Sequence, residues 1–128
     1  MAQKTEEKFV FPFERLEVWQ LAVELADFVL SLLEFFPANR HFRLIEQMES
    51  AVCSIAQNIS EGKGRQYEKE FIQYLYIGEG SLFETLTLSE IMRRRALITD
   101  QESMTIRKKA ETLDRKLHGL INSLKKRG

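Results

Sequence analysis

The chain has 128 residues and a mass of 15.0 kDa, which is enough to bury a core without disulfides. Its 44% hydrophobic and 30% charged residues exclude an intrinsically disordered chain and a membrane-spanning one. Six glycines and two prolines predict long elements with few turns, which argues against a β-sandwich. The single cysteine, Cys53, excludes a disulfide framework within the chain and a cysteine-based zinc site.

Residues 1–12 are predicted to form a polar N-terminal arm. Phe9, Phe11 and Phe13 alternate, which is compatible with a short extended segment, and Pro12 disfavours a helix there. The polar start does not resemble a secretory signal, and the longest apolar run, residues 28–33, is too short to cross a bilayer. We therefore expect no membrane association and a cytoplasmic location.

Residues 14–36 have polar side chains at alternating spacings of three and four, which predicts a helix. More than half of its circumference is apolar, whereas a surface helix of a monomer needs an apolar arc of only about 100°. We therefore expect one apolar stripe to contact a second copy of the chain. The pattern does not fix which stripe this is; the chosen candidates for the oligomer interface are Val18, Leu21, Leu25, Phe28 and Leu32.

Three further helices are predicted over residues 41–61, 67–96 and 100–126. Gly62 is expected to end the second helix in a left-handed cap. Gly78 and Gly80 lie inside the third helix and predict the close approach of a neighbouring helix. Thr99 and Glu102 have the spacing of a capping box for the fourth helix. The expected fold is all-α, an antiparallel up-down-up-down four-helix bundle over residues 13–128.

Charge is balanced overall but unevenly distributed. The chain has 19 basic and 19 acidic residues, whereas from residue 93 onward it has 11 basic and 4 acidic residues. A neutral chain is not a general nucleic-acid binder, yet a basic third can contact anions. The candidates for nucleic-acid contact are Lys63, Arg65, Arg93, Arg94, Arg95, Arg107, Lys108, Lys109, Lys125, Lys126 and Arg127. A solvated surface that complements helix ends is the competing interpretation of these cations.

Two short sequence runs carry more specific information than helical periodicity alone. They are Asn-Ile-Ser-Glu-Gly-Lys-Gly-Arg at 58–65 and Gly-Ser-Leu-Phe-Glu at 80–84. Together they resemble the bacterial four-helix-bundle family named for open reading frames in the intervening sequences of 23S ribosomal RNA genes. The resemblance covers about residues 11–124. It assigns family-motif structural roles to Asn58, Glu61, Gly62, Gly64, Arg65, Gly80, Ser81 and Glu84.

The resemblance implies an antiparallel bundle that assembles as a ring-like homopentamer. It also implies similarity to the accessory variability proteins of diversity-generating retroelements, which are strongly basic pentamers that bind nucleic acid and a reverse transcriptase. This chain differs from them in being neutral. The family carries no established enzyme activity to transfer, and Glu84 is expected to form a buried ion pair or a contact at a ring interface.

The sequence shows no constellation typical of catalysis. His41 and His118 are judged to lack His, Asp or Glu partners at ligand spacing, and nothing at helical spacing activates Cys53. The Gly62–Arg65 turn follows a helix and has no Ser or Thr after its lysine, unlike a Walker loop. We therefore predict no catalytic residue, no cofactor and no metal, and not an enzyme.

Two functions are compatible with these observations. The first is a non-enzymatic, homo-oligomeric scaffold or adaptor, expected to be pentameric by resemblance, that associates with ribosomal RNA or an RNA-handling partner. The alternative is a module that binds nucleic acid directly through the basic C-terminal third.

Overall fold

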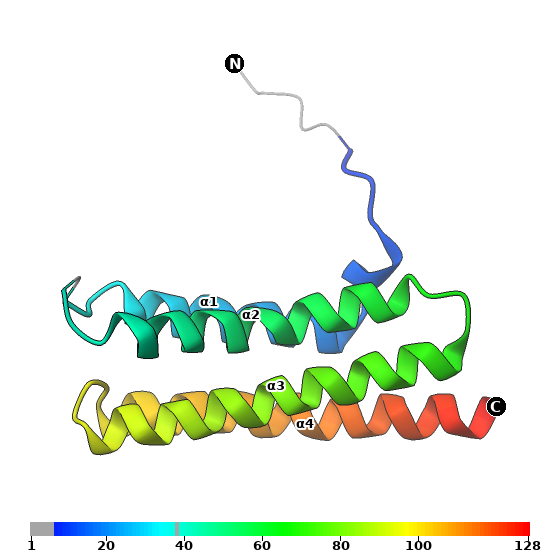
Figure 1. Cartoon of the computed structure of the whole chain (residues 1–128). Coiled ribbons are helices and arrows are strands. Elements are labelled where there is room, and N and C mark those ends of the chain that lie inside the picture. Colours follow the sequence, from blue (N-terminus) through cyan, green and yellow to red (C-terminus); the bar gives the residue numbers. More distant parts are fainter. Residues whose placement is uncertain (1–6, 38) are drawn as a thin grey trace.

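The computed structural model describes residues 7–37 and 39–128. A short 3-10 helix, η1 (Pro12–Arg15), precedes four α-helices: α1 (Glu17–Leu33), α2 (Phe42–Lys63), α3 (Glu68–Arg94) and α4 (Asp100–Arg127). Consecutive helices run in opposite directions, with α1 and α2 in one layer and α3 and α4 in the other (Figure 1). The predicted all-α four-helix bundle is confirmed. None of the helices in these two ranges is long and apolar enough to cross a membrane.

The first helix is shorter than residues 14–36 at both ends. Pro12 begins a separate 3-10 turn, and the extended backbone of Leu16 divides it from α1. The third helix ends at Arg94 because Ala96 adopts a left-handed backbone with φ of 58°, and the Leu97 N–H donates to the Met92 carbonyl at 2.9 Å. This geometry turns the chain from α3 into α4.

The start of α4 follows the prediction from the sequence. The Glu102 N–H donates to Thr99 Oγ1 at 3.0 Å, and the Thr99 N–H donates to the Glu102 carboxylate at 2.8 Å. The capping box is therefore confirmed, and it satisfies two backbone donors that a helix N-terminus otherwise leaves unpaired.

Gly62 does not form the predicted left-handed cap. No glycine in the chain has a positive φ, α2 continues to Lys63, and its C-cap Gly64 has φ of −80°. Gly62 is instead a buried interior residue of α2. A Cβ there would lie 2.5 Å from Tyr74 Cβ and 3.0 Å from Phe71 Cδ1. The residue has to be glycine because α3 crosses α2 at this point.

The glycines of α3 differ from each other. Gly78 is buried, and a Cβ there would lie 3.5 Å from the Ile55 carbonyl oxygen of α2, so the predicted close approach is confirmed at this position. Gly80 is exposed, and a Cβ there would meet no atom within 4 Å in the described residues. The prediction of a close neighbour is therefore wrong for Gly80 within a single chain.

The core contains apolar side chains from all four helices. Its largest fully buried members include Leu25, Met48, Ile55, Leu82 and Leu117. Leu25 and Val18 were predicted to lie at an oligomer interface, and burial in the chain's own core corrects that assignment. The remaining residues of that stripe, Leu21, Phe28 and Leu32, are half-buried and pack against the same core. Most of the surplus apolar surface of α1 is thus covered within the bundle.

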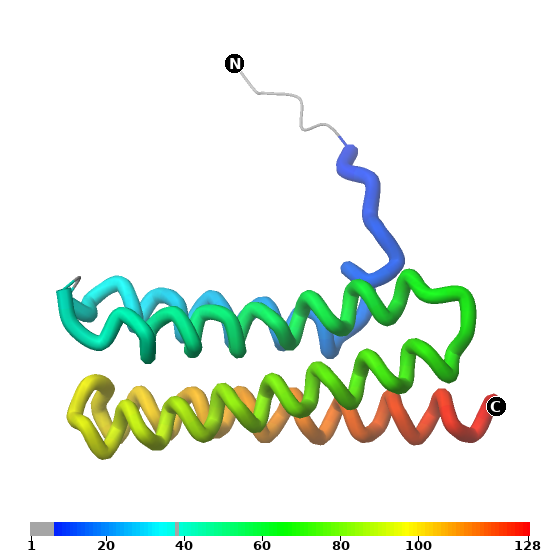
Figure 2. Tube along the Cα trace, viewed as in Figure 1, coloured from blue at the N-terminus to red at the C-terminus, as the bar shows by residue number. Residues whose placement is uncertain are grey.

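The N-terminal segment lies apart from the bundle. Figure 2 shows the first described residues as an extended tube that leads away from the helices. The rings of Phe9, Phe11, Phe13 and Trp19 follow one another at centroid distances of 5.0, 5.9 and 5.2 Å. Phe9 is 71% exposed and Phe11 52% exposed. Residues 1–6 of the predicted polar arm lie outside the described residues, and the described part, residues 7–11, presents aromatic side chains to solvent.

Gly62→Ala is expected to lower the free energy of unfolding by about 1–3 kcal/mol, because the new methyl group would force α2 and α3 apart. Urea denaturation monitored by circular dichroism measures this change. Gly119→Ala in α4 is the matched control, because a Cβ there meets nothing within 4 Å. The control should gain about 0.5–1 kcal/mol, since alanine favours a helix over glycine. A Gly62→Ala variant as stable as wild type would contradict the close crossing.

Candidate functional site

The basic residues predicted to contact nucleic acid are spread along the length of the bundle. Lys63 is the last residue of α2, Arg65 follows it, and both lie near Arg127 at the end of α4. The arginines at 93–95 lie at the opposite end of the bundle, and the basic residues at 107–109 lie between the two ends on α4 (Figure 1). The structure therefore does not gather all the candidates for nucleic-acid contact into one patch.

Two of the three successive arginines are bound to carboxylates. Arg93 donates to both oxygens of Glu90 at 2.8 and 3.0 Å and to Asp100 at 3.3 Å, and Arg94 donates to Glu90 at 2.8 Å. The hydrogen bonds from Arg93 and then from Arg94 lower the pKa of Glu90 to about 2. Arg93 joins the end of α3 to the start of α4 through Asp100, whereas Arg94 pairs only within α3 and Arg95 has no ion pair in the described residues.

The other end of the bundle has a small hollow of about 210 Å³. Lys63, Arg65 and Arg127 line it together with Glu68, which Arg127 contacts at 3.5 Å. Tyr67 also lines the hollow and is 62% exposed. This hollow brings together three of the predicted cations, an exposed aromatic ring and Glu68, and Arg65 is also paired with Glu61 at 3.1 Å.

The first family run connects α2 to α3. Asn58 donates to the Ser54 carbonyl at 2.8 Å and to Ser54 Oγ at 2.9 Å, and Ser54 Oγ shares a hydrogen bond of 2.9 Å with Ser81 Oγ. Arg65 reaches back to Glu61 at 3.1 Å, as the sequence indicated, and also donates to Tyr74 Oη. These contacts are structural, although Asn58 lies inside α2 and does not cap its end.

The residues of the second family run lie on two different sides of α3. Ser81 faces α2 and Leu82 is fully buried, whereas Gly80 and Glu84 face solvent. Glu84 has no ion pair or hydrogen bond within the described residues, so the predicted buried ion pair is wrong. Ser81 and Leu82 therefore pack inside the bundle, whereas the side of α3 that carries Gly80 and Glu84 is left uncovered.

That uncovered face of α3 is unusually apolar. Ile77 is 54% exposed, Phe83 50% and Ile91 44%, and they alternate along the helix with Gly80 and Thr87. Leu86, Thr87 and Ile91 line a shallow hollow of about 440 Å³ there, together with the charged residues Glu90 and Arg94. We call this surface the outward face of α3. Its composition is that of a contact surface and not of a solvated helix face.

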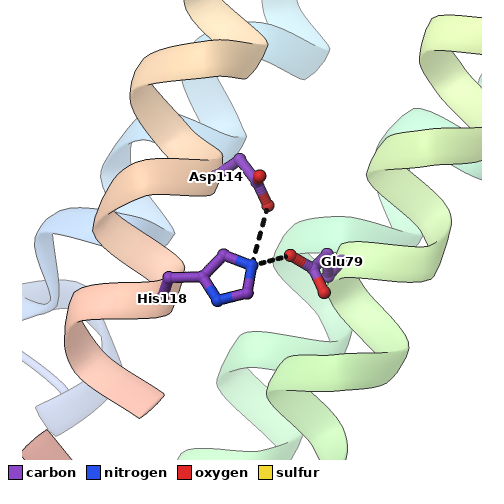
Figure 3. A group of neighbouring side chains, drawn as sticks. All are labelled: Glu79, Asp114 and His118. Atoms are coloured by element: carbon purple, nitrogen blue, oxygen red, sulfur yellow. Dashed lines mark ion pairs between the residues drawn. The ribbon is translucent and has the colours of Figure 1, made fainter. Parts of the chain in front are cut away.

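A polar cluster lies between α3 and α4. Glu79 comes from α3, and Asp114 and His118 come from adjacent turns of α4, with all three side chains directed to one point (Figure 3). His118 Nε2 is in close ion-pair contact with Glu79 Oε2 and lies 3.8 Å from Asp114 Oδ1. Glu79 exposes only 9% of its surface, whereas His118 is exposed at the rim. The cluster therefore places a buried carboxylate beneath a solvent-accessible imidazole.

The electrostatics of this cluster are unfavourable for two ionised carboxylates. Burial raises the pKa of Glu79, the neighbouring Asp114 raises it further, and His118 opposes both effects. Glu79 Oε2 and Asp114 Oδ1 are buried and receive no hydrogen bond of acceptable geometry. Such a cluster can hold a proton between its oxygens or bind a cation.

The sequence analysis missed this cluster, and its judgement that His118 lacks an acidic partner was wrong. Asp114 and His118 are four residues apart on one helix, a spacing that places both side chains on the same face. Glu79 could not be paired with them from the sequence, because it lies on another helix.

Cys53 has the environment that the sequence analysis expected. Its half-buried thiol packs against the core, and burial raises its pKa, which disfavours a nucleophile.

Comparison with known proteins gives the family. A protein family described as "23S rRNA-intervening sequence protein" matches residues 14–119. The chain belongs to this family. Among solved structures it is similar to a protein with unknown function from the S23 ribosomal protein family of Bacteroides thetaiotaomicron VPI-5482. The TM-score is 0.74 at 24% identity, over 81% of this chain and 97% of the other.

The likeness of this 23S rRNA-intervening sequence protein to the Bacteroides structure supports the four-helix fold alone, because their identity is low. No curated protein matches the chain. Neither description names a reaction, so the function has to be argued from the surfaces and clusters described above.

Glu79→Gln is expected to make the protein more stable than wild type at neutral pH when chelator is present. A raised pKa means that the folded state holds the Glu79 proton more tightly than the unfolded chain does. The resulting stabilisation is present below the usual glutamate pKa of 4.5 and is lost as the pH rises through the raised value. Glutamine keeps the side chain neutral, so the loss disappears.

Denaturant midpoints measured from pH 4 upward test this, with Glu111→Gln on the exposed side of α4 as the control. The stability difference between Glu79→Gln and wild type should grow with pH, while that of the control should stay near zero. A difference that does not change with pH would contradict the raised pKa.

Proposed function

We propose that this chain is a non-enzymatic, homo-oligomeric scaffold whose copies join through the outward face of α3 and the N-terminal arm. The observation that carries this proposal is the apolar outward face of α3. It is a helix surface with exposed Ile77, Phe83 and Ile91 around a glycine that has no neighbour.

The outward face has the properties expected of a contact between copies. Three exposed apolar side chains recur along α3, and a helix that presents several of them to solvent is typical of a contact surface. Gly80 supports the same interpretation, because glycine in a helix interior costs about 1 kcal/mol relative to alanine and gives no benefit inside this chain. The close approach of a helix from a second copy would compensate that cost.

The arm provides a second element for assembly. Phe9 and Phe11 extend beyond the bundle on an irregular segment, and their rings are mostly exposed. Aromatic rings bury large areas when they are covered, so an arm of this kind gains stability by docking on another copy. A second copy is the occupant that the chain itself supplies for both surfaces. The expected number of five copies derives from the family resemblance described above, and a cytoplasmic location agrees with the single free cysteine.

Light scattering is expected to show an oligomer for wild type, and Ile91→Glu is expected to shift the mass to that of one chain. The reason is that a buried, unpaired carboxylate at a contact between copies is costly. Phe9→Ser combined with Phe11→Ser should weaken the oligomer in a dilution series, because it removes the aromatic arm.

Phe42→Glu is the matched control. Phe42 is 64% exposed at the start of α2 and belongs to neither proposed surface, so this variant should keep the mass of wild type. Circular dichroism on all variants verifies that the helices form. A monomeric wild type, or an unchanged mass for Ile91→Glu, would contradict the proposed interface.

The hollow at the end of the bundle favours a second candidate function, the binding of RNA phosphates. Lys63, Arg65 and Arg127 converge there beside the exposed ring of Tyr67, a combination suited to phosphate contact and base stacking. A symmetric oligomer would present several copies of this hollow, so weak individual contacts would add up by avidity.

The double variant Lys63→Glu/Arg127→Glu is expected to weaken binding to a structured ribosomal RNA fragment and to reduce the salt slope of log K by about 2. Fluorescence anisotropy at low and moderate salt measures both quantities. Arg107→Glu/Lys108→Glu is the control, because it makes the same charge change on the middle of α4. Equal weakening by both pairs would mean that only overall charge matters, and absence of binding by wild type would leave the scaffold without an RNA ligand.

A further inference from the structure

We propose that Glu79, Asp114 and His118 form a binding site for a divalent transition-metal ion, with Zn²⁺ the best match to this set of donor atoms. The three residues lie between α3 and α4, and none of them belongs to the outward face of α3 or to the basic hollow. The proposal is therefore independent of the proposed function.

The geometry brings three potential ligands together from two helices. One donor atom of each residue lies within 4.8 Å of the other two. Asp114 and His118 are one helical turn apart on α4, and Glu79 faces them from α3, as Figure 3 shows. Because both backbones are in regular helices, the relative positions of the three side chains are set by the packing of the bundle and not by a loop.

The buried oxygens provide an independent indication of a ligand. Glu79 is nine-tenths buried, and its Oε2 is directed at the same nitrogen as Asp114 Oδ1, although neither oxygen receives a well-formed hydrogen bond. Imidazole Nε2 carries at most one hydrogen, so it cannot satisfy two carboxylate oxygens at once. A cation between the three atoms would interact favourably with all of them.

The donor set selects the class of ion. One imidazole nitrogen and two carboxylate oxygens suit Zn²⁺ and related first-row metals, whereas Mg²⁺ and Ca²⁺ prefer oxygen alone. Zn²⁺ at about 2.0–2.2 Å from each donor would require donor atoms a little over 3 Å apart, which agrees with the 3.8 Å between His118 and Asp114. Binding of the ion would require His118 Nε2 to move away from Glu79 Oε2, and His118 is exposed at the rim of the cluster.

An ion held in this way would keep a position for water or an external ligand. Three protein donors leave a fourth tetrahedral position open. Asp114 also lines a groove of about 270 Å³ between α3 and α4, whose apolar wall includes Phe83 and Ala110. The groove provides access from solvent to the side of the cluster. Bound metal would also join α3 to α4 and thereby stabilise the bundle.

Isothermal titration of Zn²⁺ into protein stripped with chelator tests the proposal. Wild type is expected to bind one ion per chain and to show a higher melting temperature in its presence. His118→Ala and Glu79→Gln are each expected to lower the affinity at least about tenfold, as the loss of a ligand does in metal sites. Because His118 is exposed, its replacement by alanine leaves the fold intact, which circular dichroism verifies.

His41→Ala and Cys53→Ser are the matched controls, because they remove the other histidine and the single cysteine. Both should bind Zn²⁺ like wild type. Failure of wild type to bind Zn²⁺ saturably would overturn the proposal and would mean that the cluster only shares a proton. Equal binding by His118→Ala would also overturn it, because the ion would then lie elsewhere. Neither result depends on the oligomeric state, so the scaffold proposal is tested separately.

Discussion

The crossing of α2 and α3 is the constraint on which the rest of this structure depends. Gly62 and Gly78 let the two backbones approach so closely that a methyl group at Gly62 would overlap Tyr74. The hydrogen bonds of Asn58, Ser54 and Ser81 extend the same contact along the helices. Because α3 is held tightly against α2 on one side, its opposite side is fixed in position and remains uncovered.

The outward face of α3 and its side toward α4 differ in chemical character. On its outward face the apolar residues around Gly80 have no partner in the chain, which favours association with another copy. On the side that faces α4, Glu79 is enclosed with Asp114 and His118 in a setting that is poor in hydrogen-bond donors. One helix thus contributes to both the proposed contact surface and the proposed ion site, and Phe83 borders both.

Individual basic residues form local contacts that the net charge of the chain does not reveal. Arg93 and Arg94 neutralise Glu90 at the turn from α3 to α4, and Lys116 contacts Glu17 at 3.2 Å between α4 and α1. Several cations of the basic third are therefore bound within the chain or act between its helices. At the far end of the bundle, Lys63, Arg65 and Arg127 line one accessible hollow. Net neutrality and a local anion-facing surface are compatible for this reason.

The sequence by itself determined the helices, their antiparallel order, the capping box at Thr99 and the close approach at Gly78, because these depend on local spacing and on residue size. Only the tertiary structure decided which apolar residues remain exposed to solvent. Helix 14–36 has excess apolar surface, yet Val18 and Leu25 are covered by the bundle, whereas Ile77, Phe83 and Ile91 of α3 remain exposed. The polar cluster was decided in the same way. The spacing of Asp114 and His118 was visible in the sequence, but the approach of Glu79 depends on how α3 packs against α4, and helical periodicity does not specify which helix a given face will meet.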